Sequence, residues 1–122
     1  AASFSVGMPN YPAVYAVRAG LAYVQGVGVD RIADYARPLV EACYEELARL
    51  PVELITPPPS TGLAGILAFR HPKAEALHAY LHERNINIMQ HAGRLRVAIH
   101  GYNTMEDVDS FLAALKEGLD HV

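Results

Sequence analysis

Residues 94–119 read RLRVAIHGYNTMEDVDSFLAALKEGL, and this stretch decides the fold class. Residues 94–100 alternate between apolar side chains and polar or small ones, which is typical of a strand with one buried face. Thr104, with Asp107 three positions on, predicts the N-cap of a helix. The apolar residues that follow recur at helical spacing and form one face: Val108, Phe111, Leu112, Leu115 and Leu119. A strand followed at once by an amphipathic helix indicates a domain that mixes the two.

Upstream of this stretch, the second half of the chain predicts further strands and one more helix. His71-Pro72 ends a strand and opens a helix, and Ala92-Gly93 is a tight turn between two strands. The predicted strands cover residues 52–55, 63–69, 86–90 and 94–100. The expected fold is α/β (or α+β), with a small, mostly antiparallel sheet and helices packed on one face.

The first half of the chain predicts two helices. Asn10 caps the first, which continues through residues 13–24 until Gly26-Val27-Gly28 ends it. Residues 13–24 carry one charge and are apolar on every face, so the helix needs a partner surface in another subunit or in a part of the protein outside this chain. The second helix is predicted from about Asp30 to Leu50, where Pro38 should kink or restart it.

Composition excludes several classes of protein. The chain has 122 residues, 52% of them hydrophobic, which is enough for one packed domain and too apolar for disorder. Ten Lys and Arg against 13 Asp and Glu exclude a nucleic-acid partner bound by phosphate neutralisation. The single Cys43 excludes an internal disulfide framework. No run reaches the roughly 18 apolar residues of a membrane span, and the start has no leader pattern, so we expect a cytoplasmic protein without a membrane partner.

One strand face carries the residues best suited to binding a ligand. Alternation places Arg94, Arg96, Ala98 and His100 on the face opposite the apolar side chains. Two guanidinium groups and an imidazole lie there, with room beside small Ala98, and arginine is suited to a bidentate grip on a carboxylate. The alternative interpretation is a solvated outer face without a ligand.

Other reactive side chains favour structural interpretations. His78 and His82 have the i, i+4 spacing of a metal-ligand pair, but no third ligand has convincing spacing, so a solvated helix face and no metal site are expected. Cys43 lies on an apolar stripe, which predicts a buried structural thiol. Lys73 and Lys116 lie on exposed helix faces, and neither is suited to binding a cofactor covalently.

The sequence also resembles a known family. Residues 95–109, LRVAIHGYNTMEDVD, resemble the C-terminal signature of class-V aminotransferase-family enzymes, approximately R-V-S-x-H-x-Y-N-T-x-E-E-I-D. GILAFR at 65–70 is similar to the family's G-I-V-S-F-R strand, and GMPN at 7–10 is similar to its G-T-x-N segment. This group of fold-type-I, pyridoxal-phosphate (PLP) enzymes includes cysteine desulfurases, selenocysteine lyases and isopenicillin-N-epimerase-like proteins. The resemblance covers nearly the whole chain.

The resemblance implies the C-terminal, small domain of a dimeric PLP enzyme. Residues 1–28 correspond to a connecting segment and a helix that the family packs on the large domain and the dimer partner, and residues 29–122 to the small domain. Arg96 matches the arginine that binds the substrate's α-carboxylate, and His100 matches a histidine of the same signature. Both are candidate substrate-binding residues, while residues 102–104, Tyr-Asn-Thr, are expected to serve as turn and helix cap.

The chain departs from the family pattern at informative places. Met8 stands where the family has a threonine that reaches the cofactor phosphate of a neighbouring subunit, and Ala98 replaces the signature serine. Desulfurases of the family carry a catalytic cysteine on a long loop between the last two strands, which here shrinks to Ala92-Gly93. The resemblance therefore favours an aminotransferase- or epimerase-like parent over a desulfurase. Because the family's cofactor-binding groups lie mainly in the large domain, we expect this chain alone to bind no PLP and to be inactive.

Two functions of different classes follow. The first is the substrate-carboxylate-binding domain of a PLP enzyme acting on an amino acid, whose partners are the missing large domain and a second copy. The alternative is a non-catalytic α/β module that binds a small acid or a protein partner, which should have an amphipathic first helix. The sequence leaves transamination, epimerisation and elimination open.

Overall fold

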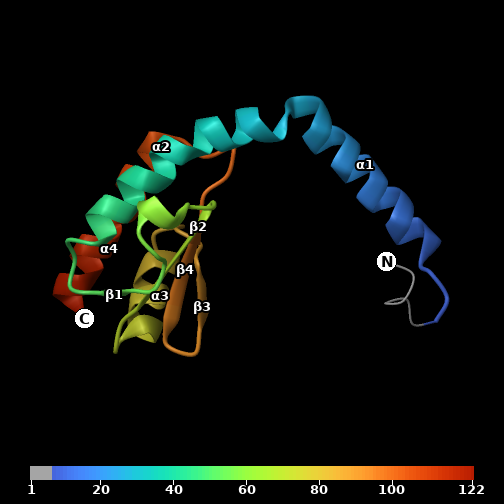
Figure 1. The fold of residues 1–122 in the computed structure, drawn as a ribbon. Coiled ribbons are helices and arrows are strands. Elements are labelled where there is room, and N and C mark those ends of the chain that lie inside the picture. Colours follow the sequence, from blue (N-terminus) through green and yellow to red (C-terminus); the bar gives the residue numbers. More distant parts are fainter. Residues whose placement is uncertain (1–6) are drawn as a thin grey trace. The chain divides into compact units, whose positions relative to one another are not determined.

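A computed structural model describes residues 7–122 of the chain. The chain forms two compact units, one ending at Ile32 and one covering Ala33–Val122 (Figure 1). The first residues of the expected connecting segment, 1–6, lie outside the described residues.

The first unit contains helix α1, Tyr11–Val27. Asn10 begins it as predicted, because its side-chain oxygen accepts a hydrogen bond of 3.2 Å from the backbone N–H of Ala13. Gly28 ends the helix with a positive φ of 98°, and its N–H donates to the carbonyl of Val24. No residue of α1 is buried, and the exposed large apolar side chains include Tyr11, Val14, Tyr15, Val17, Leu21, Tyr23, Val24 and Val27.

The second unit is built on a four-stranded sheet with the order β1-β2-β4-β3. Its strands are β1 (Glu53–Leu54), β2 (Ile66–Arg70), β3 (Met89–His91) and β4 (Arg94–Ala98). Every neighbouring pair is antiparallel, which confirms the predicted arrangement. Strand β3 begins three residues later than predicted, because Asn85 adopts φ 60° and the N–H of Ile86 bonds back to the carbonyl of Leu81 at the end of the preceding helix.

Three further helices accompany the sheet: α2 (Val29–Leu47), α3 (Ala74–His82) and α4 (Met105–His121). Helix α2 crosses the division between the units and continues through Pro38. Of the two predicted effects of that proline, a kink or a restart, the restart is therefore wrong. A short 3₁₀ turn, η2 (Pro59–Thr61), lies in the proline-rich loop before β2. Among the described residues, no helix has the length and apolar character needed to cross a membrane.

The core lies between one face of the sheet and the helices (Figure 1). Leu67 and Phe69 of β2 and Leu95 of β4 are fully buried against side chains of the helices. The core residues contributed by the helices include Leu39, Val40, Cys43, Leu47, Leu77, Leu81, Phe111 and Leu115. The packing of helices on one sheet face confirms the predicted fold class and leaves the other face of the sheet exposed.

Candidate functional site

The outer face of β4 presents the predicted arginines. Along the strand, Arg94, Arg96 and Ala98 are exposed while Leu95 and Val97 are buried, so the predicted alternation is confirmed. Because a β-strand carries successive side chains on opposite faces, all three exposed side chains lie on one side of the sheet.

The register of the sheet supplies the immediate surroundings of Arg96. Its cross-strand partners are Ala68 on β2 and Met89 on β3, and Ala98 follows it on the same face. Ala68 and Ala98 are small, so the sheet surface beside the guanidinium is open to a ligand. Within residues 7–122, no carboxylate of Asp or Glu lies within 4.0 Å of the nitrogens of Arg96. The guanidinium therefore retains its full capacity to bind an external carboxylate.

His100 lies two residues beyond the end of β4 and is exposed. Its backbone is fixed by Asn103: the His100 N–H donates to Oδ1 of Asn103 at 2.9 Å, and the Asn103 N–H donates to the carbonyl of His100 at 3.0 Å. The imidazole stacks on the ring of Tyr102, with centroids 5.6 Å apart. The turn thus holds the strand extension that carries His100 while its imidazole stays accessible.

The same turn also caps helix α4. The Thr104 N–H donates to Oδ2 of Asp107 at 2.9 Å, and the Asp107 N–H donates to the Thr104 hydroxyl at 3.3 Å, so the capping box is complete. The side-chain amide (Nδ2) of Asn103 donates to the same Asp107 oxygen at 3.4 Å. These contacts confirm the predicted turn and cap roles of Asn103 and Thr104.

Arg94, which was predicted on the outer face, belongs to a row of charged side chains whose other members were not predicted. The register aligns Glu53, Arg70, Arg94 and His91 in one row across all four strands. Arg70 pairs with Glu53 at 3.3 Å. Which residues share this row depends on the register between strands that are distant in the sequence. The sequence indicates the register of β3 and β4 through the tight turn that joins them, but it does not indicate the register of the other strands.

The two histidines considered as metal ligands instead contact the segment before β3. Nε2 of His78 lies 3.1 Å from the carbonyl oxygen of Ile88, and Nδ1 of His82 lies 2.9 Å from Oδ1 of Asn87. Their rings stack with centroids 6.2 Å apart. Among residues 7–122, no group of three or more His, Cys, Asp or Glu side chains is placed to hold a metal ion.

A pocket of about 350 Å³ lies beside this segment, at the edge of β4 that β3 leaves unpaired. Its polar lining includes Asn85, Asn87, Asn103 and Ser110, and its apolar lining includes Ile99 and Phe111. The pocket borders the Asn103 turn on the helix-covered side of the strand, whereas Arg96 lies on the outer face.

Cys43 is fully buried in the core, as predicted for a structural thiol. Burial raises the pKa of its thiol to about 12, because the low-dielectric surroundings disfavour the thiolate. A thiol with that pKa remains protonated near neutral pH and is a poor nucleophile.

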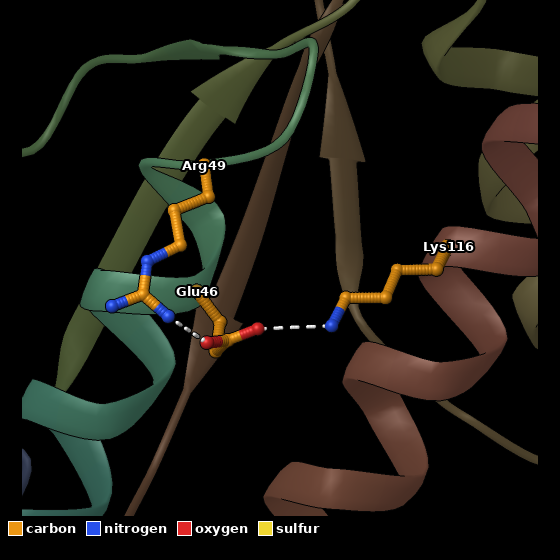
Figure 2. A network of polar contacts seen from close by, with 3 residues as sticks. All are labelled: Glu46, Arg49 and Lys116. Atoms are coloured by element: carbon orange, nitrogen blue, oxygen red, sulfur yellow. Dashed lines mark hydrogen bonds and ion pairs between the residues drawn. The ribbon is translucent and has the colours of Figure 1, made fainter.

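Both lysines are engaged in the helix layer. Lys116 Nζ lies 2.9 Å from Oε2 of Glu46, whose other oxygen pairs with Arg49 at 2.5 Å (Figure 2). The hydrogen bond from Lys116 and the two nearby positive charges lower the pKa of Glu46. Lys73 Nζ donates to the backbone carbonyl of Val122. Neither amine belongs to the sheet face that carries Arg96.

Sequence comparison identifies the family. Residues 1–111 match the family model described as aminotransferase class-V. The chain belongs to the class-V aminotransferase family. Arg96 and His100 both fall within the matched residues.

Curated relatives share sequence along most of the chain. A probable cysteine desulfurase of Pyrococcus abyssi is 28% identical over 129 residues, which cover 93% of this chain and 32% of the relative. A cysteine desulfurase of Salmonella newport is 28% identical over 127 residues, covering 92% of this chain and 31% of the relative. The chain thus spans about a third of the length of these family members.

Solved structures of the family share the fold. The apo structure of a cysteine desulfurase from Thermococcus onnurineus superposes with a TM-score of 0.83 at 25% identity, covering 98% of this chain and 34% of that one. A cysteine desulfurase from Escherichia coli gives a TM-score of 0.80 at 21% identity, over 98% of this chain and 33% of that one. These names give no support to the expected aminotransferase- or epimerase-like parent, although the structure does retain the short Ala92-Gly93 connection between β3 and β4.

Proposed function

We propose that this chain is the C-terminal, substrate-carboxylate-binding domain of a PLP-dependent class-V enzyme that acts on an amino acid. The observation that carries the proposal is Arg96. It is exposed on the outer face of β4, lies beside Ala68 and Ala98, and has no carboxylate partner within residues 7–122.

Arg96 would bind and orient the α-carboxylate of the substrate. A guanidinium can donate two parallel hydrogen bonds to a carboxylate, which fixes both the position and the plane of that group. The backbone of Arg96 is paired with β2 on one side and β3 on the other, so the Cα atom that carries the side chain is fixed within the sheet. A ligand bound there would be oriented by a rigid element rather than by a loop.

His100 is the second proposed substrate contact. It follows Ala98 along the direction of β4, and its backbone is tied to Asn103 by two hydrogen bonds. Its imidazole can donate or accept a hydrogen bond. In this proposal Arg96 holds the carboxylate, while His100 contacts another polar atom of the substrate.

The remaining parts of the enzyme are proposed to lie outside this chain. The chain spans about a third of its relatives' length, and both of its lysines are engaged in the helix layer. We therefore assign PLP and the lysine that binds it to the large domain, which makes this chain alone inactive. PLP supplies electron withdrawal from the amino acid when it is bound there.

The exposed apolar helix α1 supports a larger assembly. No residue of α1 is buried, although its large side chains are mostly apolar. Exposed apolar surface of this kind marks an interface. We propose that residues 1–28 are the connecting segment and helix that pack on the large domain and on the second subunit of a cytoplasmic homodimer, and that residues 29–122 form the small domain.

Titration of the 122-residue chain with L-alanine and acetate, followed by amide chemical shifts, tests the carboxylate site. We expect both ligands to shift amides of β2 and β4 around Arg96 and to bind at least several-fold more weakly to Arg96→Gln. Arg37→Gln is the matched control, because it removes an exposed arginine from α2, where Arg37 pairs with Asp34 at 3.0 Å. Equal binding to the Arg96→Gln variant and the control would contradict the proposal.

A separate titration with PLP tests the assignment of the cofactor to the large domain. We expect no visible absorption band that borohydride fixes onto a lysine of this chain. A stoichiometric band at Lys73 or Lys116 would favour a chain with its own cofactor site, against the proposal.

A further inference from the structure

The charged row beside Arg96 has an excess of positive charge. Arg70 and Arg94 lie directly opposite each other on β2 and β4, and His91 lies opposite Arg94 on β3. The single carboxylate in the row, Glu53, pairs with Arg70 at 3.3 Å. The chain as a whole has a net charge of −3, so this concentration of arginine is local to one sheet face.

Arg94 is the member of the row without a counter-charge. Within residues 7–122, no Asp or Glu oxygen lies within 4.0 Å of its guanidinium, while its cross-strand neighbour carries the same charge. Like charges directly opposite each other on a sheet are destabilising. An external anion placed at Arg94 would relieve this repulsion, and His91 would offer a further hydrogen-bond donor on its other side.

The position of Arg94 relative to Arg96 indicates the kind of anion. The two residues are separated by one position on the same strand face, so their Cα atoms lie about 7 Å apart. Both side chains are long enough for their guanidinium groups to bind two acidic groups of one small molecule. An amino acid whose α-carboxylate is bound by Arg96 can therefore place an anionic group of its own short side chain at Arg94.

We infer that Arg94, supported by Arg70 and His91, forms a second anion subsite, and that the substrate class is an amino acid with an acidic group on its side chain. The inference rests on the proposed function, because it places the α-carboxylate at Arg96. It adds a specificity-determining residue for which neither the family match nor the relatives' names account. A side-chain carboxylate and a phosphate group share the chemistry that this subsite would recognise.

Two matched ligand pairs test the subsite on the 122-residue chain at low, constant ionic strength. L-Glutamate and L-glutamine have nearly the same shape but end in a charged carboxylate and a neutral carboxamide, respectively. O-phospho-L-serine and L-serine compare the presence and absence of a phosphate group. We expect glutamate to bind about five-fold more tightly than glutamine, as measured by amide chemical shifts. Stronger discrimination within the serine pair than within the glutamate pair would identify phosphate as the preferred side-chain anion.

Variants separate this inference from the proposed function. In Arg94→Gln, the affinity ratios within both pairs should fall to about one, because L-glutamate and O-phospho-L-serine lose the most affinity; in Arg37→Gln they should persist. Ratios near one for both pairs in the unmodified chain, or persistent ratios in Arg94→Gln, would overturn the second subsite. If Arg96→Gln still weakens glutamine binding in that case, the carboxylate site of the proposed function stands. If Arg96→Gln leaves every affinity unchanged, the proposed function itself fails.

Discussion

The hydroxyl of Tyr35 donates a 2.8 Å hydrogen bond to the backbone carbonyl of Asn103, 68 residues further along the chain. The side-chain oxygen of Asn103 also accepts a hydrogen bond from the backbone N–H of His100. The contact therefore joins helix α2 to the turn that positions the proposed substrate residue His100. This contact ties the turn after β4 to the helix layer.

Tyr35→Phe should lower the free energy of unfolding by about 1 kcal/mol or less. It removes one hydrogen bond at an exposed site, where water can replace the lost donor to the Asn103 carbonyl. The midpoint of urea unfolding measures the change, and Tyr102→Phe is the control because Tyr102 is exposed and its hydroxyl has no protein partner within residues 7–122. Equal midpoints for the two variants would argue against the structural role of the Tyr35 contact.

Thr104→Ala should destabilise the second unit by about 1 kcal/mol, because it removes the side-chain acceptor for the N–H of Asp107 at the start of α4. Thr104→Ser keeps that oxygen and should retain most of the stability. Thermal or urea unfolding followed by far-ultraviolet circular dichroism distinguishes the two variants. A serine variant as unstable as the alanine variant would show that the cap oxygen is not the cause.

Features that depend on local pattern could be predicted from the sequence. The alternating burial of β4 follows from strand periodicity, and the Thr104 cap follows from the spacing to Asp107. The family signature placed Arg96 and His100 as candidates, and the strand face of Arg96 agreed with the alternation. In each case the information lies within a few consecutive residues.

Features that depend on pairing between distant segments could not be predicted. The Arg70–Arg94 neighbourhood and the position of Ala68 beside Arg96 follow from the register of β2 and β4, strands separated by helix α3 and strand β3. Pro38 was expected to kink or restart α2, and it does not restart it. The cost of the proline is local, whereas the buried side chains around it, including Leu39 and Val40, hold the helix in the core. Tertiary packing decided these points.

Gly65→Ala should destabilise the sheet by about 1–3 kcal/mol, in the range of overpacking substitutions. A Cβ at Gly65 would lie 2.5 Å from the backbone oxygen of Ile99, and the Gly65 carbonyl accepts the N–H of Ile99 at 2.7 Å. Backbone atoms cannot rotate away as a side chain can, so β2 and the end of β4 would have to separate. Gly20→Ala is the control, because a Cβ there meets nothing within 4 Å, and its urea midpoint should not fall.

Cys43 should be inert to thiol reagents in the folded protein. Burial excludes the reagent and raises the pKa of the thiol to about 12, so almost no thiolate forms at mildly alkaline pH. Reaction with Ellman's reagent should be slow in native buffer and complete within minutes in concentrated guanidinium chloride. Rapid stoichiometric reaction under native conditions would contradict the buried position of the thiol.

Glu46 should make stability depend on pH in the acidic range. Lys116 and Arg49 lower the pKa of its carboxyl in the folded state. A carboxyl whose pKa is lowered by folding stabilises the fold fully above its unfolded pKa and loses that contribution as the pH falls through the folded pKa. Glu46→Gln should therefore have a lower urea midpoint than the unmodified chain at about pH 7, and the difference should vanish once the carboxyl is protonated in both states.

The neighbouring Glu45→Gln is the control for this titration, because Glu45 is exposed and pairs with no cation within residues 7–122. Lys116→Gln provides an independent test, since removing the partner that lowers the pKa of Glu46 should reproduce most of the pH-dependent loss. If the effect of Glu46→Gln stayed constant from neutral to strongly acidic pH, the stabilisation would come from packing of the side chain. If Glu45→Gln matched it at neutral pH, the loss would reflect net charge rather than the Glu46–Lys116 pair that links α2 to α4 (Figure 2).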